Sequence, residues 1–207
     1  MPPISWFSAA ASSGTLSEDG RVVFCVEACE NYQKQSYRNR CYFFSSQGRE
    51  SLTVPIVRGR SELPVRDVRI DYSTPWVVRS KRAIVSAYKS AAYFDHYSDG
   101  LFAILDSMPE TLWELDLALI GYFNEKLGLN AEIRLTEYYA RDAQDRAVIH
   151  PKKPDPWASK RPYFQVFAQK HGFIPNLSVM DLLFNEGPDS LDYIRTSTQT
   201  SGICPRA

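Results

Sequence analysis

A short apolar run at residues 22–26, followed closely by a polar segment at residues 30–40, constrains the fold of this chain more than any other feature. Apolar runs of this length that contain valine and phenylalanine are typical of a buried β-strand. The polar segment holds two asparagines, two arginines and a lysine. Open α/β sheets bind ligands in the crevice beyond the ends of their strands. The pattern therefore predicts a sheet-containing domain with a polar binding site after this strand.

The length and charge of the chain exclude several classes of protein. A chain of 207 residues suits a single domain. Because 24 basic residues balance 24 acidic residues, the chain as a whole has no general attraction for nucleic acid. No apolar stretch approaches the roughly 20 residues of a membrane helix, and no secretion signal is visible. We therefore expect a cytoplasmic protein with no membrane span and no nucleic-acid partner.

Four cysteines raise the question of a metal site. They are Cys25, Cys29, Cys41 and Cys204, and no histidine lies near the first three. Cys25 stands inside the apolar run, where a free thiol behaves as a small buried hydrophobe. The spacing therefore favours structural thiols over zinc, and we expect no metal.

Helical and strand patterns alternate along the chain, which predicts an α/β or α+β domain with a central mixed sheet and flanking helices. The clearest pattern is one long amphipathic helix at residues 109–127, whose apolar face consists of Leu112, Leu115, Leu119, Ile120 and Phe123. Further helices are expected at 4–11, 79–88, 93–105, 163–171 and 178–184, and strands at 21–27, 41–44, 51–57, 65–71 and 131–139. A proline-rich surface loop is expected at residues 141–161. Residues 1–193 are expected to form one domain, and residues 194–207 a disordered tail.

Several segments together resemble the WbqC-like protein family, which is associated with bacterial O-antigen genes. The resemblance follows the chain in order through residues 2–7, 30–40, 52–55, 86–88, 93–97 and 172–188. It implies a cytoplasmic accessory of surface-polysaccharide assembly that acts on a nucleotide-linked sugar. Family members usually begin with a short apolar strand, whereas this chain begins at Met1-Pro2, so we expect that a neighbouring strand of the sheet is missing or shortened.

The polar segment supplies the first candidate site. Guanidinium groups suit phosphates, and amides suit sugar hydroxyls. The alternative is that the asparagines hold turn backbone while the cations face solvent. The predicted substrate-binding residues in this segment are Asn31, Tyr32, Lys34, Arg38, Asn39 and Arg40.

A second candidate site lies on the predicted helix at 178–184. Glu186 follows an apolar run, so its carboxyl is a candidate general acid or base with a raised pKa. Asp181 and Asn185 lie one turn apart on one helix face, and Asn176 precedes the helix. The alternative is ordinary capping, with Asn176 near the start and Gly187 ending the helix.

Two further residues outside these segments are candidates. His96 lies in an aromatic cluster and is the histidine best suited to acid–base catalysis, while Asp71 stands beside Tyr72 at a predicted strand end. Lys152 and Lys153 are better explained as a solvated loop than as a phosphate clamp.

The commonest catalytic and cofactor-binding motifs are absent from the sequence. It contains no GxSxG, GxGxxG, P-loop or HExxH pattern, and it indicates neither a cofactor nor an oligomeric state. We expect an enzyme of surface-polysaccharide biosynthesis that transfers an acyl or aminoacyl group to a nucleotide-linked amino sugar. The alternative is a non-catalytic partner that binds a glycan precursor or an assembly enzyme.

Overall fold

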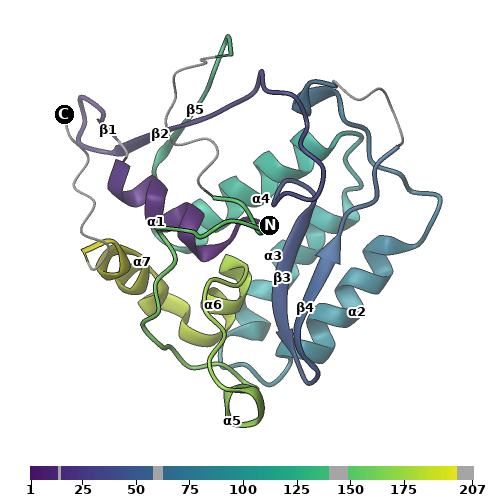
Figure 1. Ribbon diagram of the computed structural model, residues 1–207, viewed down its shortest axis with the longest axis vertical. Helices are drawn as coiled ribbons and strands as arrows, with labels where there is room; N and C mark the ends of the chain where they lie inside the picture. The colour runs from purple at the N-terminus through teal and green to yellow at the C-terminus, as the bar shows by residue number, and fades with distance from the viewer. Residues whose placement is uncertain (14, 58–62, 140–148, 200–207) are drawn as a thin grey trace.

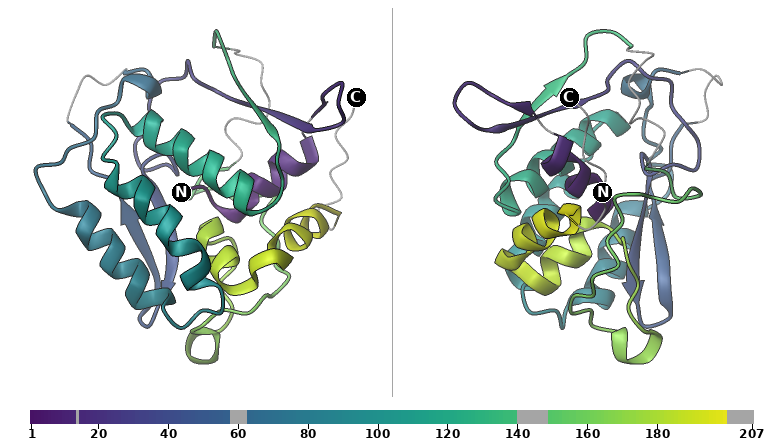
Figure 2. Two further views of the ribbon diagram at one scale, coloured as in Figure 1. Left: turned by 180° about the vertical axis from the view of Figure 1, so that it is seen from behind. Right: turned by 60° about the vertical axis from the view of Figure 1, so that its left-hand side comes forward.

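The computed structural model describes residues 1–13, 15–57, 63–139 and 149–199. These residues form a mixed α/β domain in which the strands are divided between two small sheets (Figure 1). The α/β class is confirmed. In place of one central sheet, a three-stranded sheet and a two-stranded hairpin lie on different sides of the helices (Figure 2).

The three-stranded sheet contains β1 (Thr15–Leu16), β2 (Val22–Val26) and β5 (Glu132–Leu135), in the order β1-β2-β5. β1 runs antiparallel to β2 and β5 runs parallel to β2, so the sheet is mixed as expected. Helix α1 (Ile4–Ser13) covers it, and Trp6 packs edge-on against Phe24 with ring centroids 5.2 Å apart.

The hairpin consists of β3 (Arg40–Ser45) and β4 (Gly48–Thr53) and follows directly after the polar segment. Its register pairs Arg40 with Thr53 and Ser45 with Gly48. Gly48 has a φ of +102° at the tight turn, a conformation that glycine adopts without steric cost. The hairpin therefore fixes where the polar segment ends.

Three helices form the layer behind the hairpin: α2 (Trp76–Tyr88), α3 (Phe94–Asp106) and α4 (Leu112–Lys126). Seen from behind, these helices lie in front of the hairpin (Figure 2, left). A capping box starts α4, because the Thr111 hydroxyl accepts from the Glu114 backbone and the Glu114 carboxylate accepts from the Thr111 backbone. The predicted apolar face of α4 is buried, which confirms its amphipathic pattern.

The C-terminal part contains α5 (Ala168–His171), α6 (Val179–Glu186), the 3₁₀ turn η2 (Gly187–Asp189) and α7 (Ser190–Gln199). Helix α6 is buried almost throughout and contacts α1, α3 and the hairpin. Helix α7 reaches Gln199, whereas the sequence predicts a disordered tail from residue 194; residues 200–207 lie outside the described residues.

Two predicted elements differ from those observed, and each difference has a local cause. Residues 65–71 begin as a 3₁₀ turn, η1 (Val65–Asp67), which the Asp67 amide closes by donating to the Pro64 carbonyl at 3.0 Å. Beyond the turn the segment makes only isolated bridges, Ile70 with Ile56 and Arg69 with Thr111, so it does not form a continuous strand. The helix expected at 163–171 is reduced to α5, because the Gln165 side chain bonds the Ile174 backbone at 2.9 and 3.0 Å and holds the segment extended.

The expectation that Cys25 is buried is wrong. Cys25 is exposed, because its side of β2 faces away from α1.

Candidate functional site

An ion pair anchors the polar segment that follows β2. Nε of Arg38 lies 2.8 Å from Oε1 of Glu30, and Nη2 of Arg38 contacts the same oxygen. The two side chains are only 21% and 14% exposed. The backbone of Glu30 also accepts from Val65 at 2.8 Å. Arg38 is therefore held in a defined place by charge-assisted bonds.

The end of the segment is fixed to the hairpin through Asn39. Its Nδ2 donates to the Val54 carbonyl at 3.1 Å, and the Val54 amide donates to the Asn39 carbonyl at 2.8 Å. Asn39 thus holds backbone, as the alternative interpretation of the segment expects. The next residue, Arg40, opens β3 and carries its side chain to a small cavity.

The cavity has a volume of about 20 Å³, which is room for about one water molecule. Its walls come from the open end of the hairpin, where β3 begins and β4 ends, and from all three helices behind it. They consist of residues 38–41 and 52–54, Met1, Trp76 and Ser80 of α2, Leu105 of α3, and Leu115, Asp116 and Leu119 of α4. Three predicted site residues, Arg38, Asn39 and Arg40, therefore meet here.

Asp116 is the carboxyl group of this cavity. Burial raises its pKa to about 7, while the N-terminal amine and the Arg38 guanidinium act in the opposite direction. Asp116 makes no hydrogen bond or ion pair to any part of the chain that the structure describes. A carboxyl that exchanges its proton near neutral pH and has free oxygens is suited to act as a general base.

Two buried donors stand in the walls of the same cavity. Nε of Arg40 and Nε1 of Trp76 are buried, and neither has a hydrogen-bond partner within the described ranges. Trp76 is only 6% exposed, so bulk water does not satisfy its indole N–H. A buried donor without a partner costs about 1 to 3 kcal/mol. The cavity therefore combines a carboxyl that can accept a proton with two donors that an acceptor group would satisfy.

Tyr32 lies within the electrostatic reach of this cluster. Burial raises the pKa of the Tyr32 phenol, the charges of Arg38 and Arg40 lower it, and Asp116 raises it. The structure thus brings Tyr32 together with the predicted arginines and with Asp116, which the sequence did not single out.

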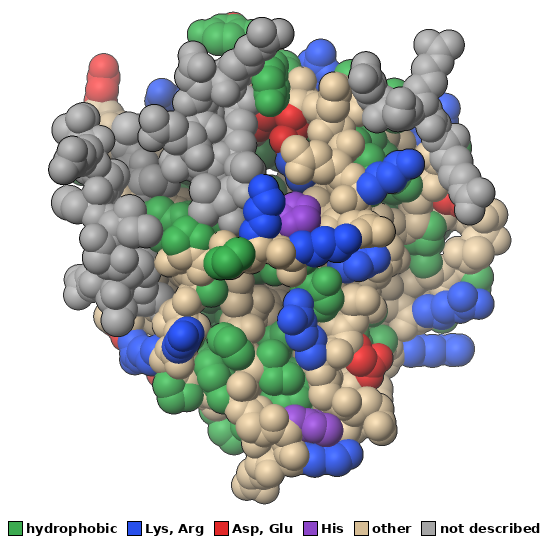
Figure 3. All heavy atoms as spheres, in the orientation of Figure 1, with side chains coloured by type: hydrophobic (Ala, Val, Ile, Leu, Met, Phe, Trp, Pro, Cys, Tyr) green, Lys and Arg blue, Asp and Glu red, His purple; other side chains and the backbone are tan. Residues whose placement is uncertain are grey.

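The proline-rich loop runs beside the polar segment. The Lys152 ammonium contacts Oε1 of Gln35, although the two residues are 117 positions apart. Partial burial lowers the pKa of the nearby His150, and Lys153, Lys152 and Arg38 lower it further. Figure 3 shows lysine and arginine side chains gathered around a histidine near the centre of this face.

Asp181, which the sequence analysis places in the second candidate site, is fully buried in α6 with 0% exposure. It accepts from the Tyr88 hydroxyl at 2.7 Å, from Gln165 Nε2 at 3.1 Å and from the Tyr163 hydroxyl. Burial raises its pKa to about 6, and these hydrogen bonds act in the opposite direction. Its donors come from α2 and from the segment before α5, so Asp181 joins three parts of the chain.

The other predicted residues around α6 also make structural contacts. Asn185 donates to the Asp181 carbonyl at 2.7 Å, and Glu186 accepts from the Phe164 amide at 2.8 Å. Asn176 accepts from the Ser5 amide at 2.9 Å and donates to Asp155 at 2.9 Å. None of these residues lines the cavity at Asp116.

The last predicted residues lie at separate places on the surface. His96 is exposed near the start of α3, where its ring meets Tyr97 edge-on with centroids 4.5 Å apart. Asp71 accepts from the Ser73 amide at 2.8 Å, and hydrogen bonding by the Ser73 side chain and then by this amide lowers the pKa of its carboxyl. Asn31 forms an isolated bridge with Pro64, and Lys34 is exposed.

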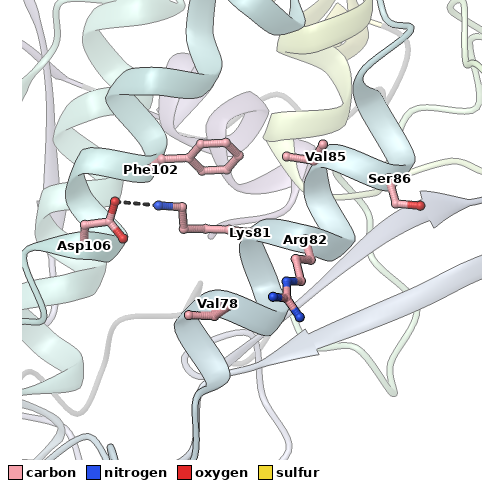
Figure 4. A pocket seen from close by; sticks show the side chains of 7 residues that line it. All are labelled: Val78, Lys81, Arg82, Val85, Ser86, Phe102 and Asp106. Carbon is pink, nitrogen blue, oxygen red and sulfur yellow. Dashed lines mark hydrogen bonds and ion pairs between the residues drawn. The ribbon is translucent and has the colours of Figure 1, made fainter.

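A larger groove of about 410 Å³ lies between α2 and α3 on their outer side. Its wall includes Val78, Val85 and Phe102, and the Lys81 ammonium crosses it to Asp106 at 2.6 Å (Figure 4). None of the residues predicted to bind substrate lines this groove.

Two negative findings apply to the described part of the chain. It contains no cluster of three or more histidine, cysteine, aspartate or glutamate side chains that is arranged to hold a metal ion. None of its helices combines the length and the apolar character needed to cross a membrane.

Comparison with known proteins places the chain in a family. The model of the WbqC-like protein family matches residues 1–153, which is most of the chain. The chain belongs to the WbqC-like family. It is 28% identical over 199 residues to the uncharacterized protein Rv1507c of Mycobacterium tuberculosis, covering 81% of this chain and 85% of the relative. No solved structure matches it. Every residue that lines the cavity of this WbqC-like protein lies within the matched range.

Sequence reasoning missed Asp116 and Trp76, although a signal for Asp116 exists. Asp116 lies four residues after Leu112 and four before Ile120, so it falls on the apolar stripe of α4. A carboxyl at a core-facing helical position either has a partner or has a shifted pKa. Trp76 carries no such signal, because a tryptophan at the start of an amphipathic helix is ordinarily a core residue.

Proposed function

We propose that this WbqC-like protein is a cytoplasmic enzyme of bacterial surface-polysaccharide biosynthesis. It transfers an acyl or aminoacyl group to the amino group of a nucleotide-linked amino sugar. The observation that carries the proposal is Asp116, a carboxyl with a pKa of about 7 and no bonded partner in the described structure, placed in one cavity with Arg38 and Arg40. Family membership supports a role in surface-polysaccharide biosynthesis, and the groups around the cavity support the transfer reaction.

The proposed roles follow from the charge and the hydrogen-bonding capacity of each group. Arg38 and Arg40 attract the phosphate-bearing end of the substrate, since guanidinium groups suit phosphate geometry. The free N–H groups of Arg40 and Trp76 donate to the sugar or to the carbonyl of the incoming group. Asp116 accepts a proton from the sugar's nitrogen. Glu186 and His96, the proton carriers expected from sequence, do not line the cavity.

The transfer step balances with an activated acyl donor such as a thioester. The nitrogen lone pair forms a bond to the acyl carbon, and the bond from that carbon to sulfur breaks. The thiolate leaves with the electron pair and takes up a proton, while the nitrogen's proton passes to the Asp116 carboxylate. Because the cavity holds about one water, Arg40 and Trp76 must move apart to admit a sugar.

Thermal stability against a panel of nucleotide sugars, nucleotides and acyl-thioester donors tests binding first. A ligand at 100 times its dissociation constant adds about 2.7 kcal/mol to the stability of the folded state. We expect a nucleotide amino sugar to raise the melting temperature of the wild type and of Arg49→Ala, but not of Arg40→Ala. Arg49 is a matched control, because it lies on the same hairpin, is exposed and does not line the cavity.

Turnover is then followed by the mass of the amino sugar in the presence of the donor. We expect Asp116→Asn to bind the sugar and to lose transfer. Binding without any product in the wild type would contradict the enzyme and favour a non-catalytic partner of a glycan precursor. The absence of binding by every member of the panel would contradict both roles.

A further inference from the structure

We propose that His150, Lys152 and Lys153 form, with Arg38, a binding site for the diphosphate of the nucleotide-linked substrate. This inference rests on the proposed function, for which it names the phosphate subsite. It assigns a role to the loop after residue 148, which sequence reasoning favoured as merely solvated. Its basis is the placement of these cations beside a polar segment that lies far away in the sequence.

One direct contact joins the loop to the polar segment, and a second bond orders the loop itself. The Lys152 ammonium contacts Oε1 of Gln35, and the Lys152 amide donates to Nδ1 of His150 at 3.2 Å. A neutral imidazole has one donor and one acceptor nitrogen. Because Nδ1 accepts from the backbone, Nε2 carries the proton and is available as a donor. The contacts therefore set the orientation of His150.

The charges that act most strongly on His150 are all positive: those of Lys153, Lys152 and Arg38. Of these, Arg38 has a carboxylate partner in Glu30. Lys152 and Lys153 are exposed and form no ion pair with any residue that the structure describes. Asp155, the acidic residue next along the loop, uses its oxygens for the Trp157 amide at 3.0 Å and for Asn176 at 2.9 Å. The cluster is therefore left with uncompensated positive charge.

Such a cluster fits an anion that carries two or more charges. Lysine binds phosphate as a point charge, arginine binds it through a planar fork, and histidine adds a single donor. The chain has no net charge that would favour a nucleic acid. The cluster adjoins Arg38, which also lines the Asp116 cavity. A diphosphate at this place would leave the attached sugar near Asp116.

Calorimetric titration with inorganic pyrophosphate and with a nucleoside diphosphate tests the site. We expect the double variant Lys152→Ala/Lys153→Ala to weaken the binding of both by about tenfold or more, since it removes two charge-assisted contacts to the phosphates. The matched control is Lys89→Ala/Lys160→Ala, which removes the same charge from two exposed lysines elsewhere. We expect this control to bind like the wild type.

Nuclear magnetic resonance of His150 supplies a second readout. A bound anion stabilises the imidazolium, so saturating pyrophosphate is expected to raise the pKa of His150, with His150→Gln identifying its signal. Equal binding of pyrophosphate by the wild type and by the lysine double variant, or an unchanged His150 titration, would overturn the proposal.

The site and the proposed activity can fail separately. Pyrophosphate carries neither an amino sugar nor an acyl group, so its binding does not depend on transfer. Pyrophosphate binding that requires the two lysines would support the site even if no product forms. Full transfer activity and substrate affinity in the double variant would overturn the site and leave the transferase proposal standing.

Discussion

Asp116 on α4 and Asp181 on α6 are both carboxyls with raised pKa values, about 7 and about 6, and burial is the main cause of both shifts. Their surroundings differ. Asp181 receives hydrogen bonds from Tyr88, Tyr163 and Gln165. Asp116 receives none within the described structure, and the cavity beside it contains two further donors without partners. The Asp181 carboxyl is therefore fully hydrogen-bonded, whereas the Asp116 carboxyl has no bonded partner in the described structure.

The difference separates a structural carboxyl from a candidate catalytic one. A buried polar group that is fully bonded contributes to a unique fold, and its loss leaves its partners unsatisfied. A partly buried group without bonds reduces stability when it is ionised, and a ligand can relieve that cost. We therefore expect substitutions around Asp181 to change the stability of the protein, and substitutions around Asp116 to change ligand binding and activity.

The largest expected effect is that of Asp181→Ala. The change leaves two hydroxyls and an amide without their acceptor, so we expect the free energy of unfolding to fall by about 3 to 5 kcal/mol. Denaturant unfolding followed by circular dichroism measures it. Asp116→Ala provides the comparison, with an expected loss of no more than about 1 kcal/mol. Equal losses in the two variants would remove the distinction between the carboxyls.

Next in size is Gly187→Ala, at the end of α6. A Cβ atom at Gly187 would lie 2.6 Å from ring atoms of Tyr93, and Gly187 has a φ of +55°. Backbone strain and overpacking together predict a loss of about 2 to 4 kcal/mol. Gly20→Ala separates the two causes, because Gly20 has a φ of +78° and open space around it. We expect Gly20→Ala to lower the free energy of unfolding by about 1 kcal/mol. A similar loss at both glycines would mean that the Tyr93 ring moves aside.

A smaller contrast is expected between two tyrosines. The Tyr88 hydroxyl donates to Oδ1 of Asp181 at 2.7 Å and accepts from the Phe44 amide at 3.1 Å. Tyr88→Phe therefore removes the partner of that oxygen and of that amide, and we expect it to lower the free energy of unfolding by about 1 to 3 kcal/mol. The Tyr32 hydroxyl has no hydrogen-bond partner among the residues described, and Tyr32→Phe is expected to cost less than about 0.5 kcal/mol. The urea midpoints of the two variants test which substitution destabilises the protein more. A larger loss of stability in Tyr32→Phe than in Tyr88→Phe would contradict this prediction.

The smallest expected effect depends on pH. The folded pKa of Asp116, about 7, is above the ordinary aspartate pKa of 3.8, so the folded state binds the extra proton between these pH values. Wild-type stability therefore falls as pH rises from about 4 to about 7 and changes no further above that range, as far as Asp116 is concerned.

Asp116→Asn removes this dependence. At pH 8 we expect the variant to be more stable than the wild type by on the order of 1 kcal/mol, after allowance for solvent near the carboxyl, with the gain disappearing near pH 4. Unfolding curves measured at both pH values provide the test. A gain that is the same at both pH values would show that Asp116 titrates normally.

Much of the fold follows from local patterns, and the site only partly does. The apolar stripe of α4 and the apolar run of β2 each depend on neighbouring residues, and sequence reasoning found both. The segment at residues 38–40 was found because its polar groups follow a strand. Asp116 was not, since its meaning depends on Arg38 and Trp76, which reach it only through tertiary packing. Sequence reasoning singled out Asp181 but not its hydrogen-bonded surroundings, because the residues that donate to it lie 16 to 93 positions away along the chain.

The most direct test of the account is the titration of Asp116 itself, by carbon NMR of its side-chain carboxyl, with Asp116→Asn identifying the signal. We expect a midpoint near 7, and a further change when a nucleotide amino sugar is added, because the ligand would form a hydrogen bond with the free carboxyl. A midpoint near 4 that no ligand alters would contradict the assignment of Asp116 as the base and the proposed function that depends on it.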